Sequence, residues 1–294
     1  MKFTKLCASD RVFYLLVWIF VVIAFIITLM PFWYVICISF SDLHAIQKGN
    51  VSFWPVGFTI EGYKQVFSQA NLWRAYYNTF WYTIVGTVCN MVATVIAAYP
   101  ISRPTFSGRR FFNFFLAFTM YFGGGMIPTY LLIVRLGLYD NRWVMVIPGL
   151  LSTWNVMLCR SAFSEMPGEM VESAQIDGAN EWLILRKIAI PLIKPTLAVV
   201  TMYYAIGHWN DFMTPLIYIN KEALQPMQVL LRRVLTQFSK DLHKGLNVST
   251  MFKSIASIQI RYVTIVVAIA PILLVYPFIQ KYFVKGVMIG AVKG

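Results

Sequence analysis

The amino-acid sequence predicts an all-helical integral membrane protein with six membrane-spanning helices. Of its 294 residues, 59% are hydrophobic and only 13% are charged, which is far from the composition of ordinary soluble domains. Long stretches without Asp, Glu, Lys or Arg also recur along the chain, and about 20 such residues suffice to cross the hydrocarbon core of a bilayer. The chain is therefore expected to form one transmembrane domain over residues 1–294.

Three uncharged stretches are long enough to cross a bilayer without help, and they are residues 12–40, 75–102 and 111–134. The first is too long to be the apolar region of a signal peptide, which has about 7 to 15 residues, and no small-residue cleavage site follows it. It is therefore expected to remain in the protein as a helix.

Three further spans are predicted from shorter or less uniform patterns, and they are residues 143–160, 195–219 and 262–281. The first lies near the lower limit of length, with Trp143 and Arg160 at its ends. The second contains three polar residues. The last contains two prolines, which a helix bundle tolerates when neighbouring helices or waters satisfy the freed carbonyls.

Lys and Arg residues orient these spans. With the amino terminus in the cytoplasm, they divide almost evenly between the two sides, but much of the outer share lies in one long loop, residues 220–261. Long loops count little toward the positive-inside rule. The remaining bias predicts that both termini, including the tail 284–294, and the loop 164–194 are cytoplasmic.

The outer loop 220–261 is strongly basic, because its seven Lys and Arg residues are opposed only by Glu222 and Asp241. Such a loop could contact anionic lipid headgroups. It could equally steer an acidic substrate, or an acidic partner that delivers one, toward the membrane. The formal net charge of +13 favours the second interpretation.

Signatures of catalysis and of metal binding are missing from the sequence. It has no G-x-x-x-x-G-K-[ST] loop, no H-E-x-x-H and no G-x-S-x-G, and its four cysteines are scattered without a C-x-x-C pair. The chain is expected to be neither an enzyme nor a metalloprotein.

A polar segment separates the fourth and fifth predicted spans. Pro167 suits the first turn of a short helix that runs to about Ile176, and Gly178 suits the left-handed residue that ends it. Asn180 can cap a second helix through Lys187. The result is a helix-turn-helix, predicted for the loop 164–194.

The first of these helices is two-sided. Its apolar side carries Met166, Met170 and Ala174, and its acidic side carries Glu165, Glu169 and Glu172. The acids could simply be solvated in an ordinary connecting loop. Alternatively, the helix could seat its apolar side in a groove and present the acids to a basic partner.

The segment resembles the signature loop of permease subunits of ABC importers, which reads Glu-Ala-Ala, three residues, Gly, nine residues, Ile-x-Leu-Pro. The residues in register are Glu172, Ser173, Ala174, Gly178, Ile188 and Pro191. Ser173 replaces the middle alanine and Ile190 the leucine.

In that family the loop is the coupling helix, which sits in a cleft on the ATP-hydrolysing subunit, where its glutamate pairs with a basic residue. The resemblance therefore implies that the following residues couple the chain to an ATPase: Glu172, Ser173, Ala174, Asp177, Gly178, Ala179 and Pro191.

The resemblance extends along almost the whole chain to the carbohydrate-uptake branch of maltose-permease type. Further matching pieces are Ile38-Ser-Phe-Ser41, Phe122 to Tyr130, Leu136-Gly-Leu138, Trp209-Asn-Asp-Phe212 and the carboxyl-terminal end from Gln280. This implies the type I ABC importer permease fold, with the coupling helix between spans 4 and 5.

The resemblance also implies partners and a location. The chain would pair with a second homologous permease subunit, a pair of ATPase subunits that bind ATP and Mg, and an extracytoplasmic solute-binding protein, in the bacterial cytoplasmic membrane. No cofactor is expected in this chain. The tail residues Gly286, Gly290, Lys293 and Gly294 would reach between the ATPase subunits, although a tail without its partner would simply fray.

The triple glycine Gly123, Gly124 and Gly125 resembles the subgroup for complex, often acidic oligosaccharides such as aldouronates, pectic fragments or alginate. In the predicted third span it allows either tight helix packing or an unwound point that lines the substrate path.

A second candidate for the substrate path is the trio Trp209, Asn210 and Asp211 in the fifth span. An aromatic face beside an amide and a carboxylate suits sugar hydroxyls, but the trio could equally lock two helices. Asp211 would repel an acidic sugar unless His208 or an arginine of the partner permease offset it, and this repulsion favours the structural role of the trio.

The sequence thus predicts a permease subunit that passes an oligosaccharide, expected to be acidic, inward by alternating access. The alternative is the same machine for a neutral oligosaccharide. An ion-coupled secondary transporter would show internal repeats and several intramembrane acids, and a membrane-embedded enzyme would need a polar cluster at the end of a span; neither pattern is evident.

Overall fold

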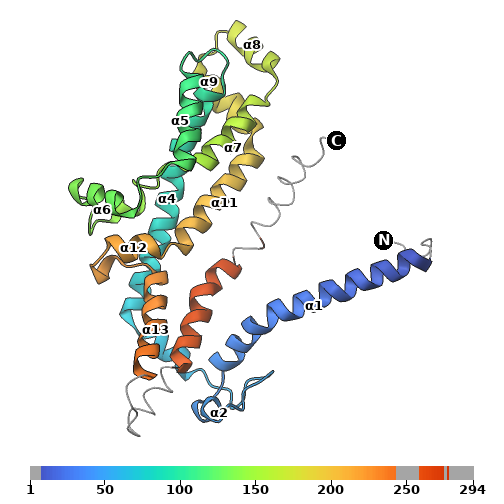
Figure 1. Cartoon of the computed structure of the whole chain (residues 1–294), viewed down its shortest axis with the longest axis vertical. Helices are drawn as coiled ribbons and strands as arrows, with labels where there is room; N and C mark the ends of the chain where they lie inside the picture. The colour runs from blue at the N-terminus through green and yellow to red at the C-terminus, as the bar shows by residue number, and fades with distance from the viewer. Residues whose placement is uncertain (1–7, 243–257, 275–276, 278–294) are drawn as a thin grey trace. The chain divides into compact units, whose positions relative to one another are not determined.

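The structure is a computed structural model that describes residues 8–242, 258–274 and 277 (Figure 1). Within these residues every regular element is a helix. The chain divides into two compact units, and each is described by itself.

The first unit comprises residues 1–69 and 233–270. Its helices are α1 (Ala8–Ser39), α2 (Leu43–Gln47), α3 (Glu61–Phe67), the end of α13 (Met227–Leu242) and most of the helix Ile258–Leu274. A small core of Cys37, Ile38, Ala45 and Val51 joins the end of α1 to α2. The Gln259 side chain donates from Nε2 to the Ser41 carbonyl at 2.9 Å, which ties the last helix to this core.

Helix α1 agrees with the first predicted span. Its stretch Val12–Ser39 has a mean hydropathy of 3.0, and the most apolar part of it is not buried inside the chain at all. An apolar surface of this size must be covered by lipid or by another subunit in a membrane protein.

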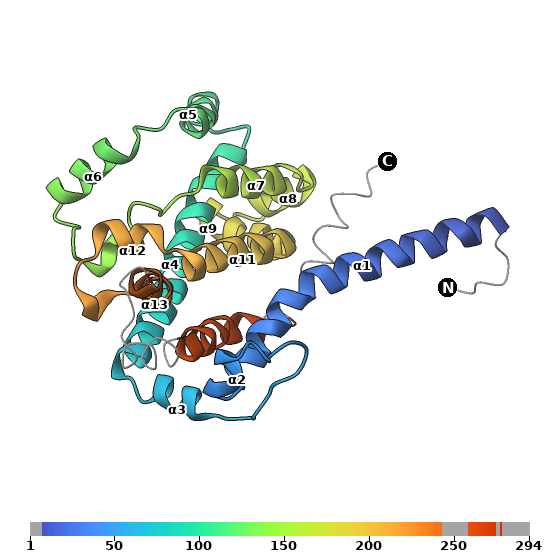
Figure 2. The ribbon, with the colours of Figure 1, turned by 60° about the horizontal axis from the view of Figure 1, so that its bottom comes forward.

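The second unit comprises residues 70–232 and 271–294. Its helices are α4 (Ala70–Ser102), α5 (Arg109–Tyr121), α6 (Met126–Arg135), η2 (Arg142–Met145), α7 (Thr153–Ser164), α8 (Gly168–Ile176), α9 (Glu181–Ile184), η3 (Leu185–Ala189), α10 (Ile190–Leu192), α11 (Lys194–Asn210), α12 (Met213–Tyr218), η4 (Glu222–Leu224) and the start of α13. Helices α7 and α11 lie side by side and pack on α4 (Figures 1 and 2). Ala98, Cys159 and Val200, one from each helix, are fully buried in the core between them.

The buried face of α4 carries polar residues as well as apolar ones, and two of them, Asn78 and Asn90, bind backbone carbonyls of segments far away in sequence. Asn90 donates through Nδ2 to the carbonyls of Gly149 and Leu150 at 2.7 and 2.8 Å. Asn78 likewise donates through Nδ2 to the carbonyls of Ala223 and Gln225, at distances of 2.8 and 3.1 Å. Irregular backbone at membrane depth needs such partners, because an unpaired carbonyl in an apolar medium costs several kcal/mol, to order of magnitude.

The predicted third span, residues 111–134, is not one straight helix. It consists of α5 and α6, which are bent by 115° relative to each other at a break of four residues. Gly125 ends the break with φ 81° and ψ 170°, a backbone conformation open essentially to glycine alone. The triple glycine therefore marks an unwound point, and among the described residues no atom beyond the adjoining ones lies within 4 Å of where a Cβ would stand on any of the three.

The predicted fourth and fifth spans are interrupted too. Seven residues that include Pro148 and Gly149 separate η2 from α7. Helix α11 ends at Asn210, and α12 follows after a short break in which the Asp211 Oδ1 accepts a hydrogen bond from the Thr214 amide at 3.0 Å. Among the described residues, two helices are long and apolar enough to cross a membrane, and the bent pair makes a third if it counts as one span.

Candidate functional site

The polar segment between the fourth and fifth predicted spans forms two short helices, α8 and α9, at one end of the second unit (Figure 1). Pro167 stands at the start of α8, and Gly178, just past its end, has φ 80°. The Asn180 side chain caps α9 by accepting from the Leu183 amide at 2.9 Å. These local features are those expected from the sequence, and together they fix the angle between the two helices.

The second helix differs from the prediction beyond Ile184. Instead of an α-helix through Lys187, the chain forms a π-helical turn over Leu185–Ala189, closed by the hydrogen bond from the Ile190 amide to the Leu185 carbonyl. Pro191 follows directly, and proline has no amide to continue an α-helical ladder. The wider turn accommodates this interruption, and such turns are common at functional sites.

Most of the residues predicted to couple the chain to an ATPase are exposed. Glu172, Ser173, Asp177, Gly178 and Pro191 are all on the surface, whereas Ala174 and Ala179 are half-buried. In α8 only Val171 is buried. The helix is thus anchored by one apolar side chain and presents the rest of its surface outward.

Exposed apolar side chains accompany these acids, although the predicted apolar side of α8 is divided. Ile176 is 87% exposed and Trp182 is 65% exposed. Met170 is exposed as well, but Met166 packs against the core between α4, α7 and α11. An exposed apolar patch beside carboxylates suits a partner that offers a groove with basic residues at its rim.

A second candidate site is a pocket of about 490 Å³ in the second unit. Its lining mixes aromatic, hydroxyl, imidazole and carboxylate side chains, of which the most polar are Thr129, Ser152, Asn155, Tyr203, Tyr204, His208, Asp211 and Thr214. Helices α6, α7, α11 and α12 all contribute. This composition suits a ligand rich in hydroxyl groups.

The wall of the pocket is held by buried hydrogen bonds to α4. His208 Nε2 lies 2.6 Å from Asn90 Oδ1. A carboxamide oxygen can only accept, so the proton of the imidazole is on Nε2. In the same way the Tyr204 hydroxyl lies 2.8 Å from Thr94 Oγ1 and accepts from the Ser152 amide at 3.1 Å.

Gly86 makes room for the imidazole. A Cβ added there would stand 2.5 Å from His208 Nε2, which is closer than real Cβ atoms approach. Gly86, Asn90 and Thr94 follow one another at intervals of four residues and so share one face of α4. This spacing is the signal by which the polar face of α4 could have been found from the sequence.

The predicted trio in the fifth span is split by the structure. Asp211 lines the pocket, but Trp209 is buried against Phe80, with ring centroids 5.2 Å apart, and Asn210 is exposed. The Trp209 indole nitrogen is buried and finds no acceptor in the part of the chain that the structure describes. Of the predicted glycines, none lines this pocket; Thr129, in the first turns of the helix α6 that follows them, lines it instead.

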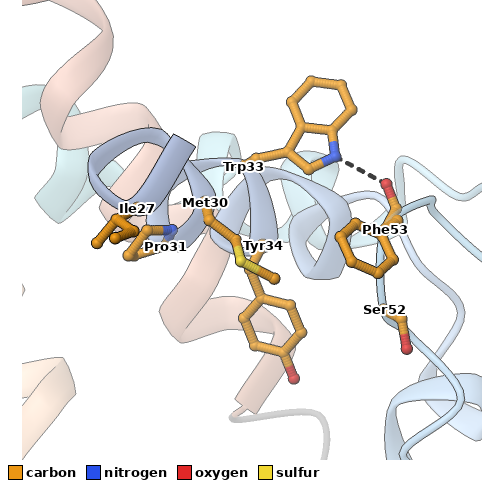
Figure 3. A pocket seen from close by; sticks show the side chains of 7 residues that line it. All are labelled: Ile27, Met30, Pro31, Trp33, Tyr34, Ser52 and Phe53. Atoms are coloured by element: carbon orange, nitrogen blue, oxygen red, sulfur yellow. Dashed lines mark hydrogen bonds between the residues drawn. The ribbon is translucent and has the colours of Figure 1, made fainter. Parts of the chain in front are cut away.

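A smaller pocket of about 340 Å³ lies on α1 in the first unit and differs in chemistry (Figure 3). Its lining is apolar except for Ser52, and comprises Ile27, Met30, Pro31, Trp33, Tyr34, Ser52 and Phe53. The Trp33 indole nitrogen donates to the Phe53 carbonyl at 2.7 Å, as Figure 3 shows. Without converging polar groups this pocket does not suit a sugar.

The tail residues Gly286, Gly290, Lys293 and Gly294 lie outside the described residues. Within residues 8–242 and 258–274, no group of three or more His, Cys, Asp or Glu side chains could hold a metal ion.

Comparison with known proteins places these features in a family context. The family model described as "Binding-protein-dependent transport system inner membrane component" matches residues 90–289. Protein LplC of Bacillus subtilis (strain 168) is 39% identical over 269 residues, which are 91% of this chain and 90% of that protein. The polygalacturonan/rhamnogalacturonan transport system permease protein YtcP of the same organism is 35% identical over 286 residues, or 97% of this chain and 100% of that protein.

A solved structure is similar as well. It is a crystal structure of a bacterial ABC transporter involved in the import of the acidic polysaccharide alginate. One of its chains superposes with a TM-score of 0.87 at 34% sequence identity, and the match covers 95% of this chain and 99% of that chain.

Proposed function

The chain belongs to the family of inner membrane components of binding-protein-dependent transport systems, and from this premise we propose the machine in which it works. It is a permease subunit of an ABC importer for oligosaccharides, a transport subunit and not an enzyme. We propose that its cargo is an acidic, uronate-containing oligosaccharide of alginate or pectic type, taken inward by alternating access.

The observation that carries the acidic cargo is the likeness to the alginate importer, which extends over nearly the full length of both chains. Two independent features support it. The relative YtcP is named for polygalacturonan and rhamnogalacturonan transport, and polygalacturonan is a polymer of uronic acid. The predicted outer loop 220–261 is basic, as a surface that receives acidic sugar should be.

The membrane arrangement is part of the proposal. We propose six spans with both termini in the cytoplasm, in which the interrupted helices described above each count as one crossing. A second, homologous permease subunit would complete a heterodimer and cover the exposed apolar surfaces of α1. A solute-binding protein would deliver the sugar to the outer face.

The α8–α9 segment would dock on the ATPase subunits. The exposed Glu172 carboxylate would pair with a basic residue there, and the left-handed Gly178 and the π-helical turn before Pro191 would hold the segment in its docking shape. The tail residues from Gly286 to Gly294 would make a second contact with the same partners. ATP and Mg would bind to the ATPase subunits, and this chain would hold no cofactor.

The sugar path would run past the 490 Å³ pocket. Asp211, His208 and the tyrosine hydroxyls would bind sugar hydroxyls, while the unwound triple glycine would allow the adjoining backbone to move. Because Asp211 caps α12 through the Thr214 amide, part of its charge is already satisfied. This weakens the repulsion that an acidic sugar would otherwise meet.

The test is ATP hydrolysis by the complex of both permeases and the ATPase pair, reconstituted in lipid with its binding protein. We expect oligogalacturonate or oligoalginate of three to five sugars to stimulate hydrolysis several-fold, and maltodextrins of equal length to leave it at the basal rate. Stimulation by maltodextrins alone would contradict the acidic cargo. It would favour a neutral oligosaccharide, with the basic loop meeting only lipid headgroups.

A further inference from the structure

A polar bridge joins the α8–α9 segment to the end of α4. The Tyr99 hydroxyl on α4 donates to Glu181 Oε2 on α9 at 2.8 Å and accepts from Arg103 Nη2 at 3.0 Å. The other oxygen of Glu181 accepts from Gln175 Nε2 on α8 at 3.1 Å. Three helices are thus linked in one hydrogen-bonded series, which ends in an arginine.

The middle of this series is rigid. Tyr99 is only 5% exposed, and its ring packs edge-on against Phe163 of α7 with centroids 5.4 Å apart. The Arg103 guanidinium lies over the same ring, 4.6 Å from its centroid. A buried phenol packed between these side chains has little room to swing aside, so a displacement of Glu181 is expected to break the bond to Tyr99 or to move α4.

Helix α8 itself has little apolar packing against the rest of the unit. Val171 is its one buried residue, whereas the other end of the bridge is continuous with the largest core of the second unit. Hydrogen bonds that involve a charged group are also stronger than neutral ones. The bridge therefore adds a directional, charge-assisted link to the apolar packing of Ile184 and Leu185 at the end of α9.

On the proposed function that α8 and α9 dock on an ATPase, we propose that Tyr99, Arg103 and Glu181 are positioning residues that transmit movement of the docked segment to α4. The same helix carries Asn90, nine residues earlier, which is about 14 Å along the axis. Asn90 holds His208 at the wall of the 490 Å³ pocket. A shift of α4 at Tyr99 would thus reach the sugar path.

The deciding variant is Tyr99→Phe, which deletes the hydroxyl but keeps the ring and its contacts with Phe163 and Arg103. In the reconstituted complex we expect normal binding of the ATPase subunits and unchanged basal hydrolysis. Stimulation by binding protein loaded with trigalacturonate should fall about tenfold, within the range of coupling between sites. The matched control is Tyr82→Phe on the same helix, whose buried hydroxyl bonds instead to the Leu224 carbonyl at 2.7 Å; it should keep the stimulation.

A readout without sugar separates this proposal from the proposed cargo. Cys89 lies on α4 and is half-buried, whereas Cys37 and Cys159 are buried. The measurement is the rate at which a maleimide labels Cys89, read by peptide mass spectrometry. We expect ATP with vanadate to change this rate in the wild-type protein, and we expect the Tyr99→Phe variant to show no such change. No ATP-dependent change in the wild-type protein would overturn the proposal.

Glu181→Ala provides a second route if Tyr99→Phe fails to accumulate, because it deletes both acceptor oxygens of the bridge. The Glu181 side chain is exposed, so its replacement does not disturb the core. It should reduce the stimulation too, and the double variant should be no worse than Tyr99→Phe alone, since both remove the same link. Additive losses, equal losses in Tyr82→Phe, or a loss of ATPase binding in Tyr99→Phe would each overturn the proposal. Failure of the proposed docking would instead appear as normal ATPase binding by a Glu172→Lys complex.

Discussion

Gly86 and Asn90 lie one helical turn apart on α4, and together they decide where the His208 imidazole can stand. One leaves space for the ring, and the other fixes its proton through a hydrogen bond of 2.6 Å. Asn90 also binds two carbonyls of the irregular segment before α7. Two residues thus join three separate parts of the second unit.

Gly86→Ala tests this arrangement. The added methyl group would collide with the His208 ring, and overpacking of this kind costs about 1 to 3 kcal/mol. We therefore expect a lower melting temperature for the purified complex. Gly207→Ala is the control for stability, because in the described part of the chain no atom outside its own helical turn lies within 4 Å of the added methyl group, and alanine favours a helix by about 1 kcal/mol. Equal melting temperatures for the two variants would show that the ring is not confined.

Glu172→Lys tests the proposed docking. Removing one partner of a buried ion pair strands the other charge and costs on the order of 3 to 5 kcal/mol, and lysine adds repulsion from the basic partner. We expect the variant complex to lose its ATPase subunits during purification and its sugar uptake in proteoliposomes. Normal uptake by the variant would remove Glu172 from the docking surface.

The trio Trp209, Asn210 and Asp211 shows what sequence cannot reveal at the residue scale. Consecutive residues of a helix point in directions about 100° apart, so three in a row cannot all face one pocket. The polar pattern includes one residue that lines the pocket, Asp211. Which residue faces inward depends on where α11 ends, and the break after Asn210 cannot be read from composition.

The break between α5 and α6 is the clearest departure from regular structure at the scale of elements. Gly125 stands at φ 81° and ψ 170°, a conformation that costs other residues on the order of 1 to 3 kcal/mol. Gly123 and Gly124, by contrast, do not have positive φ angles. Of the three glycines, only Gly125 therefore has a backbone conformation that other residues avoid.

Gly125→Ala should consequently destabilise the protein more than Gly123→Ala does. We expect the melting temperature of the purified complex to fall by several degrees for the first variant and by less for the second, measured under identical detergent and lipid. If the two variants melted together, the left-handed angle at Gly125 would not be needed for the fold.

The sequence predicted the ends of a helix well where the helix is continuous, and poorly where the helix is interrupted. The two long helices α1 and α4 end within five residues of the predicted bounds at each end. The interrupted fourth span could not be foreseen in the same way, because carbonyls at its break are bound by Asn90, a side chain distant in sequence. Hydropathy carries no trace of such a pairing.

At the scale of the whole molecule, the family and the helical class followed from motifs and composition, whereas the number of crossings and their direction remain predictions. The charge rule orients the chain only when the basic outer loop is set aside. Orientation therefore requires a direct measurement.

Single cysteines at two exposed positions would supply it, in a background whose native cysteines are replaced by serine. Lys48→Cys lies in the predicted first outer loop, and Arg186→Cys lies on the exposed side of the π-helical turn Leu185–Ala189. We expect a membrane-impermeant maleimide to label the first in intact spheroplasts, and the second only after permeabilisation. The reverse pattern would invert the proposed topology and place α8 and α9 on the wrong side for an ATPase.

The bend between α5 and α6 has a consequence for the lipid around the protein. Helix α5 has 13 residues and α6 has 10, so at 1.5 Å per residue they extend about 20 Å and 15 Å, against a hydrocarbon core of about 30 Å. A bent pair of this kind spans less of the membrane than a straight helix would, and such hydrophobic mismatch costs a fraction of a kcal/mol per Å of local thinning. We therefore expect the transport rate in proteoliposomes to depend on the acyl-chain length of the lipids.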